Sequence, residues 1–145
     1  MPEKKSVHLM EAGEELEPFE FLVTPELNQQ YLYAEEDYHP RYLEKNESGP
    51  PLVHPALLLN MSNSTRSPSF YLAPGWAAIH AAEETEFLNP ARVGKKLRVT
   101  WRIVETYEKR GKPWRVTEAL VVDEDGVQIL RRKLHSTYSS SESAK

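Results

Sequence analysis

The stretch EEDYHPRYLE, Glu35–Glu44, places an aspartate, a histidine and a tyrosine within six positions. Asp37, His39 and Tyr42 supply a carboxylate, an imidazole and a phenol, which are groups that move protons in enzymes. Asp37 can serve as a general base if burial in an apolar site raises its pKa. His39 is near enough to assist it, and Tyr42 can donate a proton or orient a water molecule. Each also has a structural interpretation: an exposed Asp at a helix end, a solvent-facing His, and a Tyr ring packed on the core.

A second imidazole, His54, directly precedes Pro55 and the apolar run ALLL. Proline favours the first position of a helix, so His54 is expected at the helix N-terminus, where backbone N–H groups lack helical acceptors. Pro55 has no N–H, and the amides of Ala56 and Leu57 are therefore the candidate donors to a polarised carbonyl. Helix capping is the alternative role for His54. Asp37 thus has two candidate imidazole partners.

The composition excludes several classes of function. The net charge of −4 gives no electrostatic reason to expect nucleic-acid binding. No apolar run reaches the ~20 residues needed to cross a bilayer, and the N-terminus lacks the apolar core of a signal peptide, so a cytoplasmic protein is expected. The chain has no cysteine, and its five histidines lack metal-ligand spacing, so we expect no metal site. Glycine-rich nucleotide motifs and the G-x-S-x-G elbow are also missing.

The elements that must position these groups follow from local patterns. A strand is expected over residues 19–23, a helix from Pro25 to about Asp37, and a buried second helix from Pro55 to a stop at Pro68. Four strands then follow from Trp76, because apolar and polar residues alternate and Gly-containing turns interrupt them at 109–113 and 123–126. His80, within the first of these strands, can point to either face of the sheet, and no role is assigned to it. We expect a loose leader over residues 1–17, one domain over 18–138 and a disordered tail over 139–145.

Three stretches resemble the MaoC-like hydratase/dehydratase branch of the hotdog fold. AEEDYHPRY (34–42) resembles the catalytic segment, GPPLVHPALLLN (49–60) the loop that leads into the central helix, and EFLNPARVGKKLRV (86–99) the strand–turn–strand. The resemblance covers about residues 19–138. It implies an α+β hotdog fold, in which an antiparallel sheet wraps around a central α-helix.

In that family an Asp, and a His five residues later, hold a water molecule against the β-carbon of an enoyl thioester. By position Asp37 matches the Asp, Tyr42 replaces the His, and His39 replaces an Asn of the motif. Pro55 stands where a Gly N–H of the family binds the thioester carbonyl. The resemblance therefore implies a modified site, in which His39, Tyr42 or His54 supplies the second group.

The resemblance implies a hydratase/dehydratase of the (R)-specific type that acts on an enoyl or 3-hydroxyacyl thioester. Coenzyme A or an acyl carrier protein would carry the substrate, and no cofactor is expected. The alternatives are a non-catalytic module that binds an acyl chain or a partner subunit, and an acyl-CoA thioesterase. A homodimer with the site at its interface is expected, although a heteromeric partner remains open. Basic residues suited to coenzyme A phosphates, or simply to a solvated strand face, are Lys95, Lys96, Arg131 and Arg132.

Overall fold

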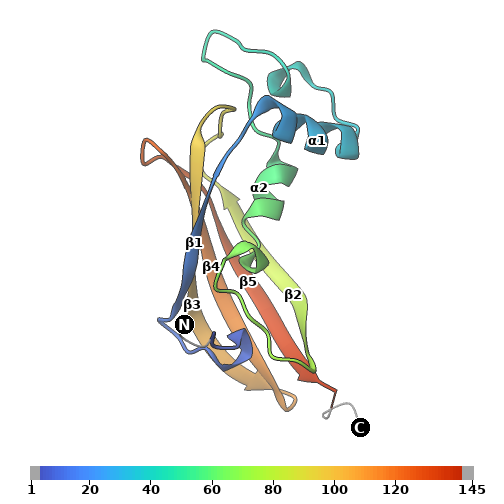
Figure 1. The fold of residues 1–145 in the computed structure, drawn as a ribbon, viewed down its shortest axis with the longest axis vertical. Helices are drawn as coiled ribbons and strands as arrows, with labels where there is room; N and C mark the ends of the chain where they lie inside the picture. The colour runs from blue at the N-terminus through green and yellow to red at the C-terminus, as the bar shows by residue number, and fades with distance from the viewer. Residues whose placement is uncertain (1–3, 142–145) are drawn as a thin grey trace.

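The computed structural model describes residues 4–141 and contains one five-stranded antiparallel sheet with helices on one side (Figure 1). The strand order is β1-β3-β4-β5-β2. The bounds of these strands are β1 Glu15–Leu22, β2 Trp76–Phe87, β3 Lys96–Lys109, β4 Lys112–Asp123 and β5 Gln128–Ser140. The expected α+β architecture is therefore present, with the helix α2 (Pro55–Met61) lying against the curved sheet (Figure 1).

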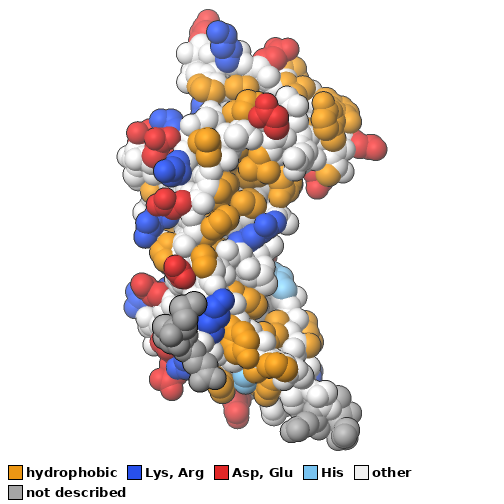
Figure 2. Space-filling view, viewed as in Figure 1, with side chains coloured by type: hydrophobic (Ala, Val, Ile, Leu, Met, Phe, Trp, Pro, Cys, Tyr) orange, Lys and Arg blue, Asp and Glu red, His pale blue; other side chains and the backbone are white. Residues whose placement is uncertain are grey.

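The core lies between that helix and the inner face of the sheet. Along β3 the buried residues are those that the alternating pattern predicts: Leu97, Val99, Trp101 and Ile103. They belong to the same buried cluster as Leu57 of the central helix. Figure 2 shows the molecular surface in the same view: acidic and basic side chains mix along the β1 and β3 side, and hydrophobic side chains gather over the helices.

The first helix, α1 (Pro25–Glu35), begins as its sequence predicts. The Thr24 side chain accepts the Leu27 N–H at 3.1 Å, and Pro25 occupies the first turn. At the other end Glu36 adopts a left-handed conformation with φ 52°, and the Asp37 N–H donates to the Leu32 carbonyl at 3.0 Å. This termination fixes the backbone of Asp37 directly after the helix.

The second helix, α2 (Pro55–Met61), is much shorter than the expected run to Pro68. The Ser62 hydroxyl donates to the Leu58 carbonyl at 2.6 Å, and the Ser62 carbonyl accepts the Trp101 indole N–H at 2.8 Å. Arg132 of β5 donates to the Leu59 carbonyl at 2.7 Å. Side chains of the sheet thus satisfy the last carbonyls, and the helix ends there because tertiary contacts replace its continuation. A 3₁₀ turn over Ser64–Arg66 follows.

The expected loose leader does not describe residues 4–17. Val7 and Met10 are buried in the core, the Val7 N–H donates to the Tyr71 carbonyl at 2.8 Å, and β1 already begins at Glu15. Val7 and Met10 thus pack over the end of the sheet, although the apolar residues of this short segment do not establish the period of a helix or of a strand. The expected tail starts inside β5, which runs to Ser140, and residues 142–145 lie outside the described part. Within residues 4–141, no helix is long and apolar enough to cross a membrane.

Candidate functional site

Asp37 and His54 meet in the structure, although 17 positions separate them in the chain. The His54 Nε2 atom lies 3.1 Å from Asp37 Oδ2. The His54 side chain is 11% exposed and that of Asp37 is 40% exposed, so the carboxylate borders solvent while the imidazole is nearly covered. Of the two candidate partners for Asp37, the structure therefore selects His54.

The hydrogen bonds of His54 determine its tautomer. Nδ1 accepts the backbone N–H of Ala56 at 3.0 Å, which is the capping interaction of α2. Because an amide N–H can only donate, Nδ1 carries no proton, and the neutral ring places its proton on Nε2. His54 thus donates from Nε2 to the Asp37 carboxylate. The two roles left open by the sequence, helix cap and partner of Asp37, are both filled by this one side chain.

Asn28 holds the segments that carry this pair. It projects from α1, is 1% exposed, and accepts the His54 backbone N–H at 2.9 Å through Oδ1. Its Nδ2 donates to the carbonyls of Tyr42 and Leu52 at 3.2 and 3.0 Å. One buried amide thus ties α1, the Tyr42 turn and the loop before α2 together. Sequence inspection missed Asn28, because a single Asn on a helix gives no signal of what its amide will meet.

The local field keeps Asp37 ionised. The backbone N–H of His39 donates to Asp37 Oδ1 at 3.2 Å, and this bond together with the His54 contact lowers the pKa of Asp37 from its ordinary value of 3.8. From the sequence alone, the role of Asp37 as a base required its burial and a pKa raised by that burial. The structure shows neither the burial nor the raised pKa. Asp37 is partly exposed and is a carboxylate held in place by donors.

His39 and Tyr42 occupy different positions around the pair. The His39 side chain is exposed and accepts the Arg41 N–H at 3.2 Å, so only its backbone contacts Asp37. Tyr42 lies in a 3₁₀ turn, Pro40–Tyr42, and its ring centroid is 4.8 Å from that of His54. The structure therefore brings Asp37, His54 and Tyr42 together and leaves the His39 imidazole outside.

An apolar cavity of about 320 Å³ lies beside this cluster. Tyr42 lines it together with Pro55 and Leu58 of α2, Phe87 at the end of β2 and Ala91 in the segment after that strand. Tyr42 is thus shared between the cavity and the His54 ring. An apolar recess beside a carboxylate, an imidazole and a phenol can accommodate a hydrocarbon chain whose polar end reaches the cluster.

The amides proposed as donors already have acceptors. The Ala56 N–H donates to His54 Nδ1, and the Leu57 N–H donates to the His54 carbonyl at 3.1 Å. Neither N–H points freely toward a ligand in this structure. The expected carbonyl-binding role of Ala56 and Leu57 is therefore not supported by the geometry, because a seven-residue helix with a His cap uses these groups itself.

The four basic residues do not form one patch. Lys95 is half-buried and pairs with Asp125, which raises the pKa of Lys95. Lys96 borders a surface recess between β3 and the end of β4. Arg131 lies on β5, 3.5 Å from the Gln128 side chain. Arg132 is buried, with its guanidinium bonded inside the protein, so it does not offer a surface site for phosphate. Within residues 4–141 no cluster of three or more His, Asp or Glu side chains could hold a metal ion.

No protein-family model matches the chain. A stretch of 79 residues is 34% identical to a protein of Oryza sativa subsp. indica named beta-fructofuranosidase, insoluble isoenzyme 1. The match covers 54% of this chain and 13% of that protein's length. The chain thus spans a small part of the curated relative that it matches, and no activity follows from the similarity.

Solved structures establish the fold. The MaoC-like dehydratase from Rhodospirillum rubrum superposes with a TM-score of 0.77 at 13% identity, over 94% of this chain and 97% of that one. R-hydratase PhaJ1 from Pseudomonas aeruginosa superposes with a TM-score of 0.73 at 15% identity, over 90% of this chain and 87% of that one. A thioesterase superfamily member from Thermus thermophilus superposes with a TM-score of 0.62 at 19% identity, over 92% of this chain and 87% of that one. The chain therefore has the hotdog fold, and its structural neighbours include MaoC-like dehydratases and R-hydratases.

Proposed function

We propose that the protein is a hydratase/dehydratase that acts on enoyl or 3-hydroxyacyl thioesters at the Asp37–His54 pair. The observation that carries the proposal is the 3.1 Å contact between a held carboxylate and a tautomer-fixed imidazole, next to a cavity of about 320 Å³ with an apolar lining. The cavity suits the acyl chain, and the carboxylate suits water activation. Dehydratases and hydratases among the structures of the same fold support the same class of reaction.

In this mechanism Asp37 is the general base, and its lowered pKa keeps it in the ionised form that can accept a proton, in place of the raised pKa that the sequence suggested. Its carboxylate takes a proton from water while the water oxygen bonds to the β-carbon, the double bond shifts its electrons toward the thioester carbonyl, and Asp37 returns the proton to the α-carbon. His54 keeps the carboxylate oriented through Nε2–H, while the lone pair of Nδ1 accepts the cap bond from Ala56. The Tyr42 hydroxyl, which has no hydrogen-bond partner within residues 4–141, is the proposed donor to the carbonyl oxygen.

The direct test is turnover of a panel of enoyl-CoA and 3-hydroxyacyl-CoA substrates of increasing chain length. Asp37→Asn removes the base at nearly constant volume and is expected to reduce kcat by about 10²-fold or more. Glu35→Gln, an exposed carboxylate on the last turn of α1, is the matched control and should retain activity. No turnover across the panel, or equal rates for wild type and Asp37→Asn, would overturn the proposal.

A non-catalytic acyl-binding module is the second candidate, because the amides of Ala56 and Leu57 are occupied and leave few donors for a thioester carbonyl. Thermal-shift titration with acyl-CoA separates the two functions. A rise in Tm without turnover supports the binding module, whereas turnover that depends on Asp37 supports the enzyme.

We also propose that the protein forms a homodimer through the outer edge of β2. This strand is bonded to β5 on one side, and no strand within residues 4–141 pairs with its other edge. Ten of its twelve residues are exposed, and the backbone groups that point away from β5 are suited to pairing with another strand. Light scattering that reports a monomer would contradict this assembly, and co-purification of a second chain in its place would indicate a heteromer.

A further inference from the structure

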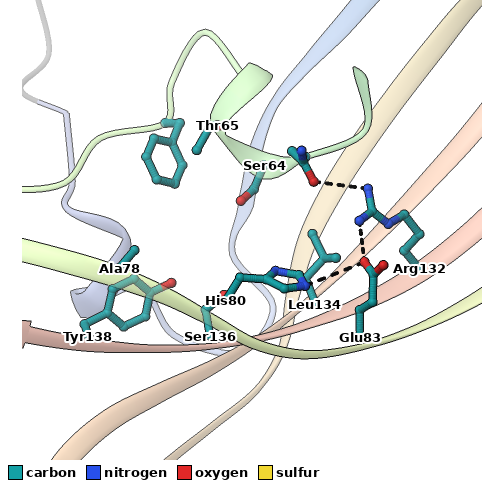
Figure 3. Close-up of a pocket in the computed structure, with 11 residues that line it drawn as sticks. Ser64, Thr65, Ala78, His80, Glu83, Arg132, Leu134, Ser136 and Tyr138 are labelled. Atoms are coloured by element: carbon teal, nitrogen blue, oxygen red, sulfur yellow. Dashed lines mark hydrogen bonds and ion pairs between the residues drawn. The ribbon is translucent and has the colours of Figure 1, made fainter. Parts of the chain in front are cut away.

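A second cavity, of about 400 Å³, lies at the opposite end of α2 from the Asp37–His54 pair (Figure 3). It is bordered by the segment that follows the helix and by the inner face of β2 and β5. Its lining combines an apolar wall of Phe70, Ala78 and Leu134 with the titratable side chains of His80 and Glu83. The proposed hydratase mechanism uses none of these groups.

A β-bulge brings the two titratable side chains into this cavity. His80 and Glu83 are three residues apart, so a regular strand would send them to opposite faces of the sheet. The pairing of β2 with β5 shifts between His80 and Ala82, and both His80 and Glu83 then face the cavity (Figure 3). Bulges that re-aim a side chain are enriched next to active sites. The backbone irregularity thus assembles a pair that strand periodicity alone would separate.

Arg132 holds the carboxylate of Glu83 in position. Its side chain is 4% exposed, and Nη1 donates to the Leu59 carbonyl at 2.7 Å and to the Ser62 hydroxyl at 2.8 Å. Nη2 donates to Glu83 Oε2, as Figure 3 shows by a dashed line. Arg132 Nε is buried without a partner in the described part of the chain, an arrangement that lowers stability. A destabilising buried group of this kind fits a side chain retained for orientation more than for stability.

Glu83 lies beside His80 at ion-pair distance. Glu83 Oε2 is 3.7 Å from His80 Nε2, which is too long for a hydrogen bond, but a negative charge on that side favours the tautomer with its proton on Nε2. The lone pair of Nδ1 is then the basic site, and this atom has no partner within residues 4–141. The hydroxyl of Ser64, which is also unbonded in that range, lies across the cavity from His80 (Figure 3).

From this geometry we propose that the cavity is a separate hydrolytic site for small acyl esters, either oxygen esters or thioesters. His80 is the general base, Glu83 and Arg132 are positioning residues, and the Ser64 hydroxyl donates to the acyl carbonyl. Water attacks the carbonyl carbon as His80 Nδ1 takes its proton, and the carbon–oxygen or carbon–sulfur bond to the leaving group breaks. The imidazolium then returns the proton to the leaving alkoxide or thiolate, so a carboxylic acid and an alcohol or thiol are released.

The test measures hydrolysis of p-nitrophenyl butyrate, for oxygen esters, and release of free thiol from butyryl-CoA, for thioesters. His80→Asn is expected to reduce the rate by about 10²-fold on whichever ester is cleaved. The chain offers a matched control in His135, which also pairs with a glutamate, Glu84, at 3.1 Å and does not line this cavity. His135→Asn should leave the rate unchanged, which separates a built site from nonspecific cleavage by any surface imidazole.

The positioning role of Glu83 has its own readout. Glu83→Gln should lower kcat at an unchanged KM and an unchanged Tm, because the uncharged amide no longer attracts the His80 ring while the cavity stays intact. A purely structural role would lower Tm and alter kcat only in proportion to the folded fraction. No hydrolysis of either ester above the buffer rate, or equal loss in His80→Asn and His135→Asn, would overturn the proposal. Neither outcome bears on enoyl hydration, which is measured with different substrates and depends on Asp37.

Discussion

His54 has two jobs at once, and a single substitution can separate them. Its Nδ1 caps α2 while its Nε2 holds Asp37. In His54→Asn the shorter amide oxygen can still accept the Ala56 N–H, since Asn is among the best capping residues, but it does not reach Asp37. We expect a Tm close to that of wild type and a kcat for enoyl-CoA hydration that is at least tenfold lower.

The control for this variant is His39→Asn, because the exposed His39 imidazole does not contact the Asp37 side chain. Its hydration rate should match that of wild type. If His39→Asn were the slower variant, the choice of His54 as the partner of Asp37 would be wrong.

Tyr138 carries a pH dependence of stability. Burial raises the pKa of this phenol from its ordinary value of 10.0 to about 12. The folded state therefore holds the proton more tightly than the unfolded state, and the resulting stability is complete below pH 10 and is lost as pH rises toward 12. At pH 11 wild type should have lost about 1 kcal/mol of unfolding free energy that Tyr138→Phe retains.

Denaturant unfolding at pH 8 and pH 11 measures this difference. Tyr33→Phe, at an exposed tyrosine, corrects for the general effect of high pH on the other ionisable groups. A difference between wild type and Tyr138→Phe that stays constant across this range would show that Tyr138 titrates normally.

At the scale of elements, Asn28 joins α1 to the two segments that carry Tyr42 and His54. In Asn28→Leu the carbonyls of Tyr42 and Leu52 and the N–H of His54 lose their partner in a buried site. We expect unfolding free energy to fall by about 3 kcal/mol or more in chemical denaturation, because each of the three unsatisfied groups costs about 1–3 kcal/mol. Gln30→Ala, an exposed position on the same helix, should change it by less than about 0.5 kcal/mol.

At the scale of the whole molecule, the sheet within residues 4–141 ends in two edge strands, β1 and β2, and the charges of β2 limit how two copies can pair along it. In a two-fold antiparallel pair of β2 strands, a residue at the axis faces its own copy. An axis at or near Glu83, Glu84 or Glu86 would bring carboxylates opposite one another, which is destabilising. The register that gives the two β2 strands the longest overlap without facing carboxylates places the axis at Ala81 or Ala82.

Cysteine cross-linking can test this register, because the chain has no cysteine of its own. Ala81→Cys or Ala82→Cys, whichever position lies on the axis, should form a disulfide-linked dimer under mild oxidation, since facing Cα atoms in such a pair are about 4.5–5.5 Å apart. Glu86→Cys should stay unlinked, as its copy would lie about 25 Å away or farther at ~3.3 Å per residue. Cross-linking of Glu86→Cys but of neither alanine variant would contradict this register.

Local patterns in the sequence determined most of the fold. Alternation along Leu97–Ile103, the Thr24-Pro25 start of α1 and the Gly-containing turns each act over a few neighbouring residues, so the chain alone specifies them. The order of these elements was enough to predict a sheet around a helix. The same reasoning predicted too long a helix after Pro55, because the end of α2 depends on contacts with Trp101 and Arg132, which come from distant strands.

The sequence also identified Asp37, Tyr42 and His54 as reactive groups, since residue type alone indicates what each can do. Only the tertiary structure decided which of them meet. His54 rather than His39 reaches Asp37 because Asn28 folds the loop before α2 against the end of α1. His80 and Glu83 share a cavity because one bulge reverses the strand's alternation. Contacts of this kind depend on backbone geometry between residues far apart in the chain, and no short sequence pattern encodes it.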